Sequence, residues 1–194
     1  MNTVVLEQTE MGDMPLDVYQ KLSNDRILFV TGEIDEKNAT DICATLLLKS
    51  HENDGKITLF INSHGGSIRD AFMIYDMMMM IDVPVETVCV GEALDEAALI
   101  LTAGEPGMRL ATKNSILAVS QLEHKYWAMH ANMVDAKKYL QMAEEDNKRY
   151  LSVIAETCDK SYKEVEADFD RRVFMNSNRA LKYGLIDKVV RFSK

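Results

Sequence analysis

Two adjacent glycines in the segment NSHGGS, residues 62–67, are the clearest local indication of chemistry in this chain. They follow an apolar run and precede a helical pattern, so we expect their backbone N–H groups to lie at a helix N-terminus. Such groups can hold an oxyanion or a polarised carbonyl oxygen, and Gly65 and Gly66 are the candidate donors. A tight turn without chemistry is the alternative, and His64 is interpreted as a turn residue.

The cysteines give no indication of a metal site. Cys43, Cys89 and Cys158 are widely separated and form no CxxC pair. This spacing is typical of reduced thiols in a cytosol-like compartment and argues against a structural zinc site. We therefore expect neither a metal nor another cofactor.

Length, charge and hydropathy exclude several classes of protein. The 194 residues argue for one domain with a substantial core. The net charge of −9 disfavours nucleic acid and anionic membranes as partners. The N-terminus lacks a basic region before an apolar core, and the sequence has no apolar run of 18 residues. We expect a cytoplasmic protein that neither spans nor binds membranes.

Strands and helices alternate along the chain and predict a mostly parallel sheet covered by helices. β-rich apolar runs predict strands at 26–31, 56–61, 86–90, 108–111 and 116–120. Helical spacing of apolar residues predicts helices at 36–50, 67–80 and 94–103. Towards the C-terminus we expect helices near 161–168 and 178–183 and a last strand at 187–192.

Residues 131–157 predict one long helix, because they contain no Gly or Pro and repeat apolar residues every three or four positions. The helix could lie flat on the sheet, or it could protrude and present its apolar stripe to another subunit. Its length favours the second interpretation.

Several long motifs, in the same order, resemble the family of ClpP, the proteolytic subunit of the ATP-dependent Clp protease. They are VVLEQTEMGDMPLDVYQKL, RILFVTGEID, LFINSHGGSIRDAFMIYDMM, VCVGEALDEAALILTAGEPGMR and RALKYGLIDKVV. The resemblance implies an α/β, crotonase-like spiral of ββα units, two stacked seven-membered rings and a hexameric AAA+ unfoldase partner. It also implies a partner-facing axial segment, 1–20, and a single domain, 21–194, with a handle helix near 131–157.

The residues at the family's catalytic positions differ from the family pattern. Asp95 stands where the family has its nucleophilic serine, Ser120 where it has the general-base histidine, and Arg172 where it has the orienting aspartate. A carboxylate is a poor acyl nucleophile, a serine is no base at neutral pH, and a guanidinium cannot orient an imidazole. The resemblance therefore predicts an inactive homologue of a serine endopeptidase, a pseudoprotease.

The resemblance also places an oxyanion hole at Gly65 and Gly66, with the N–H of Glu96 as a further donor. The Asp95 carboxylate beside it would repel a developing oxyanion. A stretch where the family has a glycine-rich, substrate-pairing strand reads EHKYWAMH here, residues 123–130. Its bulky side chains would obstruct or reshape the peptide groove, or they pack beneath the long helix.

Assembly positions also follow from the resemblance. Arg171 and Arg172 match residues that join the two rings in the family, and their like charges oppose stacking unless a carboxylate such as Asp168 or Asp170 answers them. The family's unfoldase inserts a hydrophobic loop into apolar clefts of the ring. The matching residues, which are also compatible with a place in the core, are Phe60, Met80, Leu110 and Val190, with Thr58 where tyrosine is common.

Three functions remain open. The leading hypothesis is a non-catalytic subunit that assembles into ClpP-type rings, with itself or an active ClpP paralogue, or that binds a Clp unfoldase. The second is a free-standing homo-oligomeric scaffold. The third is a crotonase-like enzyme of non-proteolytic chemistry that uses Asp95, Glu96 and His124 near the glycine pair.

Overall fold

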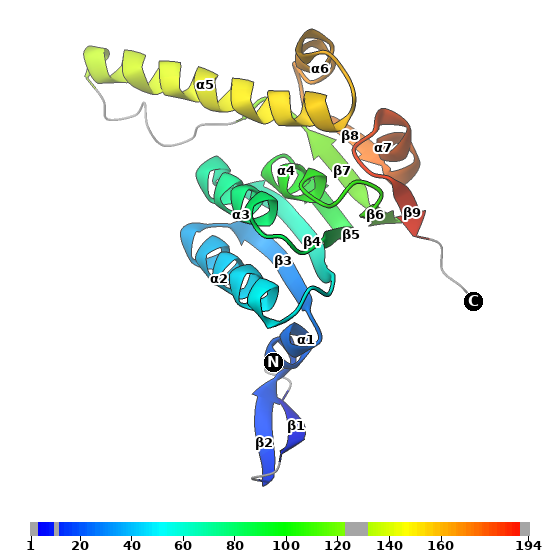
Figure 1. Cartoon of the computed structure of the whole chain (residues 1–194). Helices are drawn as coiled ribbons and strands as arrows, with labels where there is room; N and C mark the ends of the chain where they lie inside the picture. The colour runs from blue at the N-terminus through cyan, green and yellow to red at the C-terminus, as the bar shows by residue number, and fades with distance from the viewer. Residues whose placement is uncertain (1–3, 10–11, 123–131, 191–194) are drawn as a thin grey trace.

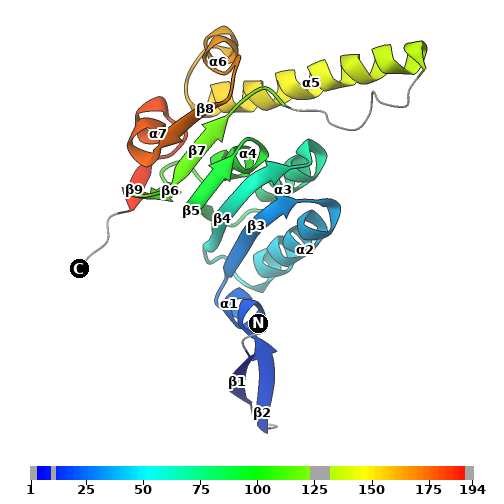
Figure 2. The ribbon, with the colours of Figure 1, turned by 180° about the vertical axis from the view of Figure 1, so that it is seen from behind.

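Alternating side chains in the central strands build a core between a sheet and the helices on one of its faces. In the computed structural model, which describes residues 4–9, 12–122 and 132–190, Ile57, Leu59 and Ile61 of strand β4 (Ile57–Gly66) are fully buried. The intervening Thr58 and Phe60 are only partly buried. This period of two puts one face of the strand against the helices and leaves the other face open within the chain. Figure 1 shows the helices in front of the sheet, and Figure 2 shows the strands from behind.

The main sheet is parallel apart from strand β8 (Val173–Asn176). Its order is β3 (Ile27–Ile34), β4, β5 (Val85–Leu94), β6 (Arg109–Thr112) and β9 (Lys188–Val190). The far end of β5 pairs instead with β7 (Ile116–Val119), and β7 pairs antiparallel with β8 (Val173–Asn176). The sheet thus splits beside β5. The residues after the end of β5, those after the end of β7 and those before the start of β8 lie at the same end of the sheet.

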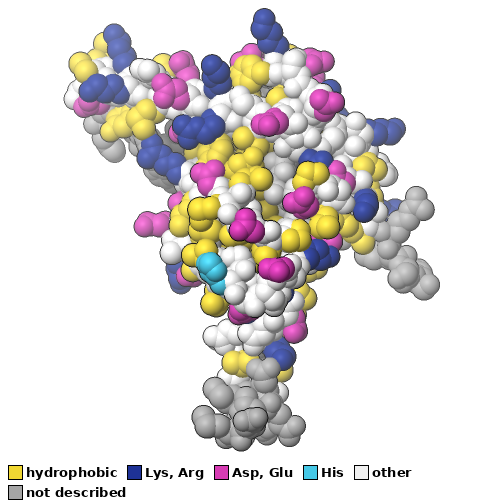
Figure 3. Space-filling model, in the orientation of Figure 1, with side chains coloured by type: hydrophobic (Ala, Val, Ile, Leu, Met, Phe, Trp, Pro, Cys, Tyr) yellow, Lys and Arg dark blue, Asp and Glu magenta, His cyan; other side chains and the backbone are white. Residues whose placement is uncertain are grey.

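The covering helices are α2 (Glu36–Glu52), α3 (Ile68–Met80) and α4 (Glu96–Thr102). Every residue of α4 is buried, which makes it the central helix of the core. The C-terminal part adds α6 (Tyr162–Asp168) and α7 (Ser177–Tyr183). Figure 3 shows hydrophobic side chains gathered on the helix-covered face below the long helix.

The long helix α5 (Met133–Thr157) protrudes from the body of the molecule, as the sequence predicted (Figure 1). Its last turns are buried through Tyr150, Leu151 and Ile154. Its first turns are not, because Met133 is 80% exposed and Leu140 is 61% exposed. The apolar stripe therefore packs on the chain's own core only at its C-terminal end.

The N-terminal part was not predicted from local patterns. Strands β1 (Val4–Thr9) and β2 (Gly12–Asp17) form a separate antiparallel pair, followed by α1 (Val18–Asn24). The Asp17 side chain forms a capping box with Gln20, which starts this short helix.

The α/β class with a mostly parallel sheet is confirmed, with three local differences. The segment Asn62–Gly66 continues strand β4 beyond a register shift after Ile61 and is not the predicted turn. Strand β5 extends to Leu94, and α4 begins at Glu96. Strand β8 was not predicted. Within the described residues, no helix combines the length and the apolar composition needed to cross a bilayer.

Candidate functional site

The site is built around a sharp turn at Asp95, between the end of β5 and the start of α4. Asp95 has φ +49° and ψ −104°, a conformation that costs a non-glycine residue about 1–3 kcal/mol. The backbone is held on both sides. Its N–H donates to the carbonyl of Ala118 in β7 at 2.8 Å, and the buried Tyr150 hydroxyl of α5 donates to its carbonyl at 3.2 Å. The surrounding structure thus maintains a strained turn that directs the Asp95 side chain.

The Asp95 carboxylate is engaged through both oxygens. The Ser120 hydroxyl donates to Oδ1 at 2.8 Å, and the Arg172 guanidinium lies 2.7 Å from Oδ2. Asp95 and Ser120 are buried, whereas the Arg172 side chain is 42% exposed. The three residues that the sequence singled out, from three segments far apart in the chain, therefore form one hydrogen-bonded group.

This arrangement can do little acyl-transfer chemistry. A carboxylate that accepts from a hydroxyl and pairs with a guanidinium is a weak nucleophile and a weak base. The Ser120 hydroxyl donates to acceptors, Asp95 and the carbonyl of Gln121, and among the described residues no imidazole bridges the two side chains. A nucleophilic serine needs a base of near-neutral pKa that takes its proton. Asp95 is instead an acceptor held by the Ser120 hydroxyl and the Arg172 guanidinium.

The glycine pair is occupied by a carboxylate of the same chain. The Gly66 N–H donates to Glu96 Oε2 at 3.1 Å. Burial raises the pKa of Glu96, and hydrogen bonds from its own N–H and from Gly66 lower it in part. The Gly65 N–H donates instead to the Ser63 hydroxyl oxygen at 3.1 Å, so both glycine N–H groups have partners within the chain. A side-chain oxygen of the chain itself already accepts from the Gly66 N–H, where an oxyanion would bind.

Close approach explains why glycine is needed at both positions. A Cβ on Gly65, which has φ +98°, would meet a Glu96 carboxylate oxygen, and a Cβ on Gly66 would meet the Ile34 carbonyl oxygen. The glycine pair therefore admits the Glu96 side chain and lets β3 and β4 approach. The His64 side chain is exposed. His124 and the segment 123–130 lie outside the described residues.

The charged residues near this site pair differently from what we expected. Arg172 finds its carboxylate within the chain, in Asp95. Asp170 accepts from Gln121 at 3.5 Å, and Asp168 accepts from the Tyr183 hydroxyl at 2.8 Å. Arg171 is exposed. If two rings stack, the unanswered positive charge at their contact would therefore come from Arg171 more than from Arg172, which is paired with Asp95.

The residues predicted for partner docking fall on two sides of the sheet. Phe60 of β4 and Leu110 of β6 belong to one row across the open face, in register with Val88 between them. Phe29 of β3 continues the row and stacks on Phe60, with ring centroids 5.5 Å apart. The sequence did not single out Phe29 or Val88. Phe29 is partly buried between buried neighbours, whereas Val88 is itself buried within the chain.

The other two predicted docking residues lie elsewhere. Met80 ends α3, a helix on the covered face, and is 65% exposed. Val190 is paired with Thr112 at the edge of the sheet. The four residues are therefore not one patch within a single chain. An assembly of several chains would be needed to bring Met80 near the open face of another sheet.

A metal centre is not found within the part of the chain that the structure describes, since no three His, Cys, Asp or Glu side chains converge there. The three cysteines are buried, and burial raises the pKa of Cys43 and Cys89 to about 11 and that of Cys158 to about 12. The thiols are therefore protonated and unreactive at neutral pH.

Comparison with known protein families gives one match over nearly the whole chain. The model of the Clp protease family matches residues 10–193. The match spans the glycine pair, the turn at Asp95, the protruding helix and the C-terminal strand.

Proposed function

The chain belongs to the Clp protease family, and on that premise we propose that it is a member without proteolytic activity, which acts by assembling with other Clp proteins. Family membership makes it a homologue of serine proteases. The loss of activity and the role in assembly are our proposal.

One contact supports the proposed inactivity above all others. The Asp95 carboxylate is hydrogen-bonded to Ser120 and paired with Arg172, so the three side chains satisfy one another. If these are the family's catalytic positions, the chain holds a structural ion pair where a protease holds a nucleophile, a base and an orienting group. The Glu96 carboxylate at Gly66 supports the same conclusion, because it competes with any substrate oxyanion.

The proposed assembly follows from what the single chain leaves uncovered. Proteins of this family typically form rings and work with Clp unfoldases. The first turns of α5 carry exposed apolar side chains, and Phe29, Phe60 and Leu110 on the open sheet face are only partly buried, so a ring would cover both surfaces. We propose a seven-membered ring, with Arg171 near the contact between rings and residues 1–20 facing a partner.

The partner in this proposal is an active ClpP ring or an AAA+ Clp unfoldase. Phe60, Met80, Leu110 and Val190 would contribute to the docking clefts once neighbouring subunits bring them together. By occupying a place in the ring or on the unfoldase, the chain would modulate proteolysis that another subunit performs.

The crotonase-like alternative is less well supported. Chemistry of that kind uses free N–H donors to polarise a substrate carbonyl. Here the Gly66 N–H already donates to Glu96. A free-standing homo-oligomeric scaffold is the other alternative, and it predicts homo-oligomers that do not mix with other Clp proteins.

The test is a comparison of labelling and assembly on the same purified protein. A serine-directed fluorophosphonate and a fluorogenic peptide measure catalytic competence, with an active ClpP as the positive control. Native mass spectrometry, for the chain alone and mixed with an active ClpP or an unfoldase, measures assembly. We expect no labelling, no turnover and mixed particles. Labelling at a rate near that of the control would refute inactivity, and homo-oligomers that never mix would favour the scaffold.

A further inference from the structure

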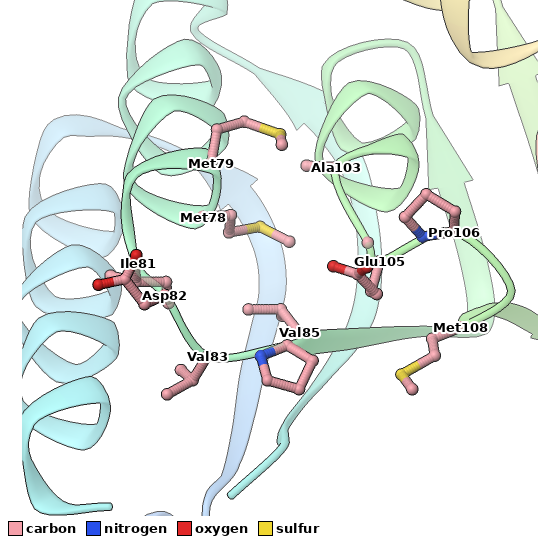
Figure 4. Close-up of a pocket in the computed structure, with 12 residues that line it drawn as sticks. Met78, Met79, Ile81, Asp82, Val83, Val85, Ala103, Glu105, Pro106 and Met108 are labelled. Atoms are coloured by element: carbon pink, nitrogen blue, oxygen red, sulfur yellow. The ribbon is translucent and has the colours of Figure 1, made fainter. Parts of the chain in front are cut away.

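A pocket of about 380 Å³ opens at the C-terminal end of α4, and the Asp95 turn lies at the other end of this helix. Two chain segments form it, and each leads from the C-terminal end of a helix into a strand (Figure 4). One joins α3 to β5, and the other joins α4 to β6. Backbone hydrogen bonds fix the second segment, since Glu105 N–H donates to Val85 and Met108 N–H donates to Glu105, each at 2.8 Å. The pocket is therefore a built feature of the fold.

The walls combine apolar side chains with negative charge. Met78, Met79 and Met108 contribute flexible, polarisable thioethers, and Val83 and Val85 contribute aliphatic surface. Figure 4 shows the Glu105 carboxylate directed across the pocket towards the Met78 side chain. Of the twelve lining residues, all of them within the described part of the chain, none is a lysine or an arginine.

The two carboxylates of the pocket, Asp82 and Glu105, are exposed and form no ion pair with any described residue. The helix ends add negative potential of the same sign. Both α3 and α4 end at the pocket, and neither has a basic residue in its last turn. A helix C-terminus carries a partial negative charge that favours a cation. Four sources of negative potential thus converge on an apolar pocket without an internal counter-ion.

We propose that this pocket binds the side chain of an arginine that a partner protein presents. The aliphatic part of an arginine side chain would lie along Met78 and Val85, as long basic side chains do on apolar surface. Its planar guanidinium has five N–H donors that point in different directions. It can therefore bind carboxylates and carbonyls on several sides of the pocket better than the compact ammonium of lysine can. The pocket is within the range of volumes that protein sites for small groups occupy.

The pocket is independent of the proposed loss of catalysis. Asp95 precedes the first residue of α4, whereas Ala103 and Glu105 follow its last residue. All seven residues of α4 separate the two features. An Asp95 variant should therefore leave binding at the pocket unchanged, so a failure of this inference would leave the proposed function untouched.

The test is a titration of the full chain, labelled with ¹³C at the methionine methyl groups, followed by methyl NMR. The probe is acetyl-Leu-Arg-Leu-amide. The matched control is the same peptide with citrulline, which keeps the shape of arginine and lacks its charge. We expect shifts at the methyls of Met78, Met79 and Met108 and an affinity about tenfold higher for the arginine peptide. Added salt should weaken binding.

Two variants separate the pocket from general attraction to an acidic protein. Glu105→Gln should reduce the affinity severalfold, whereas Glu144→Gln, at an exposed position of α5, should have no effect. Equal affinities for the arginine and citrulline peptides, shifts confined to other methionines, or an unchanged affinity in Glu105→Gln would overturn the proposal. Equally tight binding of free arginine amide would overturn the assignment to a partner protein and indicate a small-molecule site.

Discussion

Arg172 and Asp95 form an ion pair of 2.7 Å between the segment before β8 and the turn before α4. The Asp95 side chain is 6% exposed and that of Arg172 is 42% exposed. The buried partner depends on the exposed one, because a buried carboxylate without a counter-ion is costly. The pair therefore fixes the segment after α6 against the centre of the core, in addition to engaging Asp95.

We expect Arg172→Met to destabilise the protein by about 1–3 kcal/mol, because it removes the guanidinium that pairs with the buried Asp95 carboxylate. Adding Asp95→Asn should recover part of the loss, since no charge then remains buried. Arg172→Asp should be worse than Arg172→Met because it adds a second negative charge beside the first. Thermal melting measures all three, with Arg171→Met, next in sequence and exposed, as the control.

The same substitution also bears on the stacking of rings. Like charges at Arg171 and Arg172 predicted that Arg172→Asp would help rings to stack by giving Arg171 a partner. The sequence could not reveal that Asp95, far away in the chain, already pairs with Arg172, because that contact depends on how β5, β7 and β8 meet. If Arg172→Asp raises the melting temperature, the ion pair does not stabilise the domain; whether the substitution promotes ring stacking is measured separately by native mass spectrometry.

Restoring the catalytic residue types should not suffice to restore activity. The triple variant Asp95→Ser, Ser120→His, Arg172→Asp still has the Glu96 carboxylate hydrogen-bonded to the Gly66 N–H. We expect it to remain inactive towards fluorogenic peptides. Adding Glu96→Ala frees that donor, and one oxyanion-hole donor is worth roughly 10²–10³-fold in rate. The quadruple variant is therefore the first in which we expect measurable turnover.

The control for this series is the triple variant with Glu92→Ala, which removes a nearby carboxylate of β5 that does not contact Gly66. It should remain as inactive as the triple variant. Activity in the triple variant itself would show that Glu96 does not block the glycine pair in solution.

The position of Glu96 illustrates a limit of sequence reasoning. The resemblance assigned Glu96 a backbone role, through its N–H, and the glycine pair a donor role. What could not be predicted is that the Glu96 side chain turns back onto Gly66. That depends on the strained turn at Asp95 and on the space that Gly65 leaves without a Cβ. The sequence gives the residue types, but it does not give the side-chain conformation of Glu96 that brings its carboxylate to Gly66.

The pH dependence of stability should reveal this buried carboxylate. Burial raises the pKa of Glu96 in the folded chain above the value in the unfolded chain. Between these two values the folded state keeps a proton that the unfolded state has released, so stability falls as pH rises through that window. The loss is complete above the folded-state pKa. We therefore expect Glu96→Gln to raise the melting temperature at pH 7 and to change it little at pH 4.

The matched control is Glu144→Gln, an exposed glutamate of α5 that should show no pH-dependent gain. A Glu96→Gln variant that melts below the wild type at pH 7 would mean that the charged form stabilises the fold, and that its hydrogen bonds from Gly66 and its own N–H outweigh burial.

The fold was predictable where apolar periodicity is strong and local. The strands at β3, β4 and β5 and the helices α2, α3 and α5 follow from spacing alone. The pairing of β1 with β2 and of β7 with β8 was not predictable, because short strands such as Val173–Asn176 form through partners distant in sequence. The sequence predicted the apolar stripe of α5. It did not predict at which residue along the helix the stripe ceases to be buried.

That point gives a direct test of assembly through α5. Leu140 and Leu151 are on the same helix, but Leu140 is 61% exposed and Leu151 is fully buried. In the proposed ring, Leu140→Asp places a charge in a contact between subunits and should shift the assembly to smaller particles while the melting temperature of the domain is kept. Leu151→Asp buries an unpaired charge in the core and should unfold the chain.

Tyr150→Asp should resemble Leu151→Asp rather than Leu140→Asp, because Tyr150 is fully buried and donates to the Asp95 carbonyl. Size-exclusion chromatography with light scattering and thermal melting distinguish the two effects. A wild-type chain that is monomeric at micromolar concentration, with Leu140→Asp indistinguishable from it, would show that the exposed half of α5 does not join subunits.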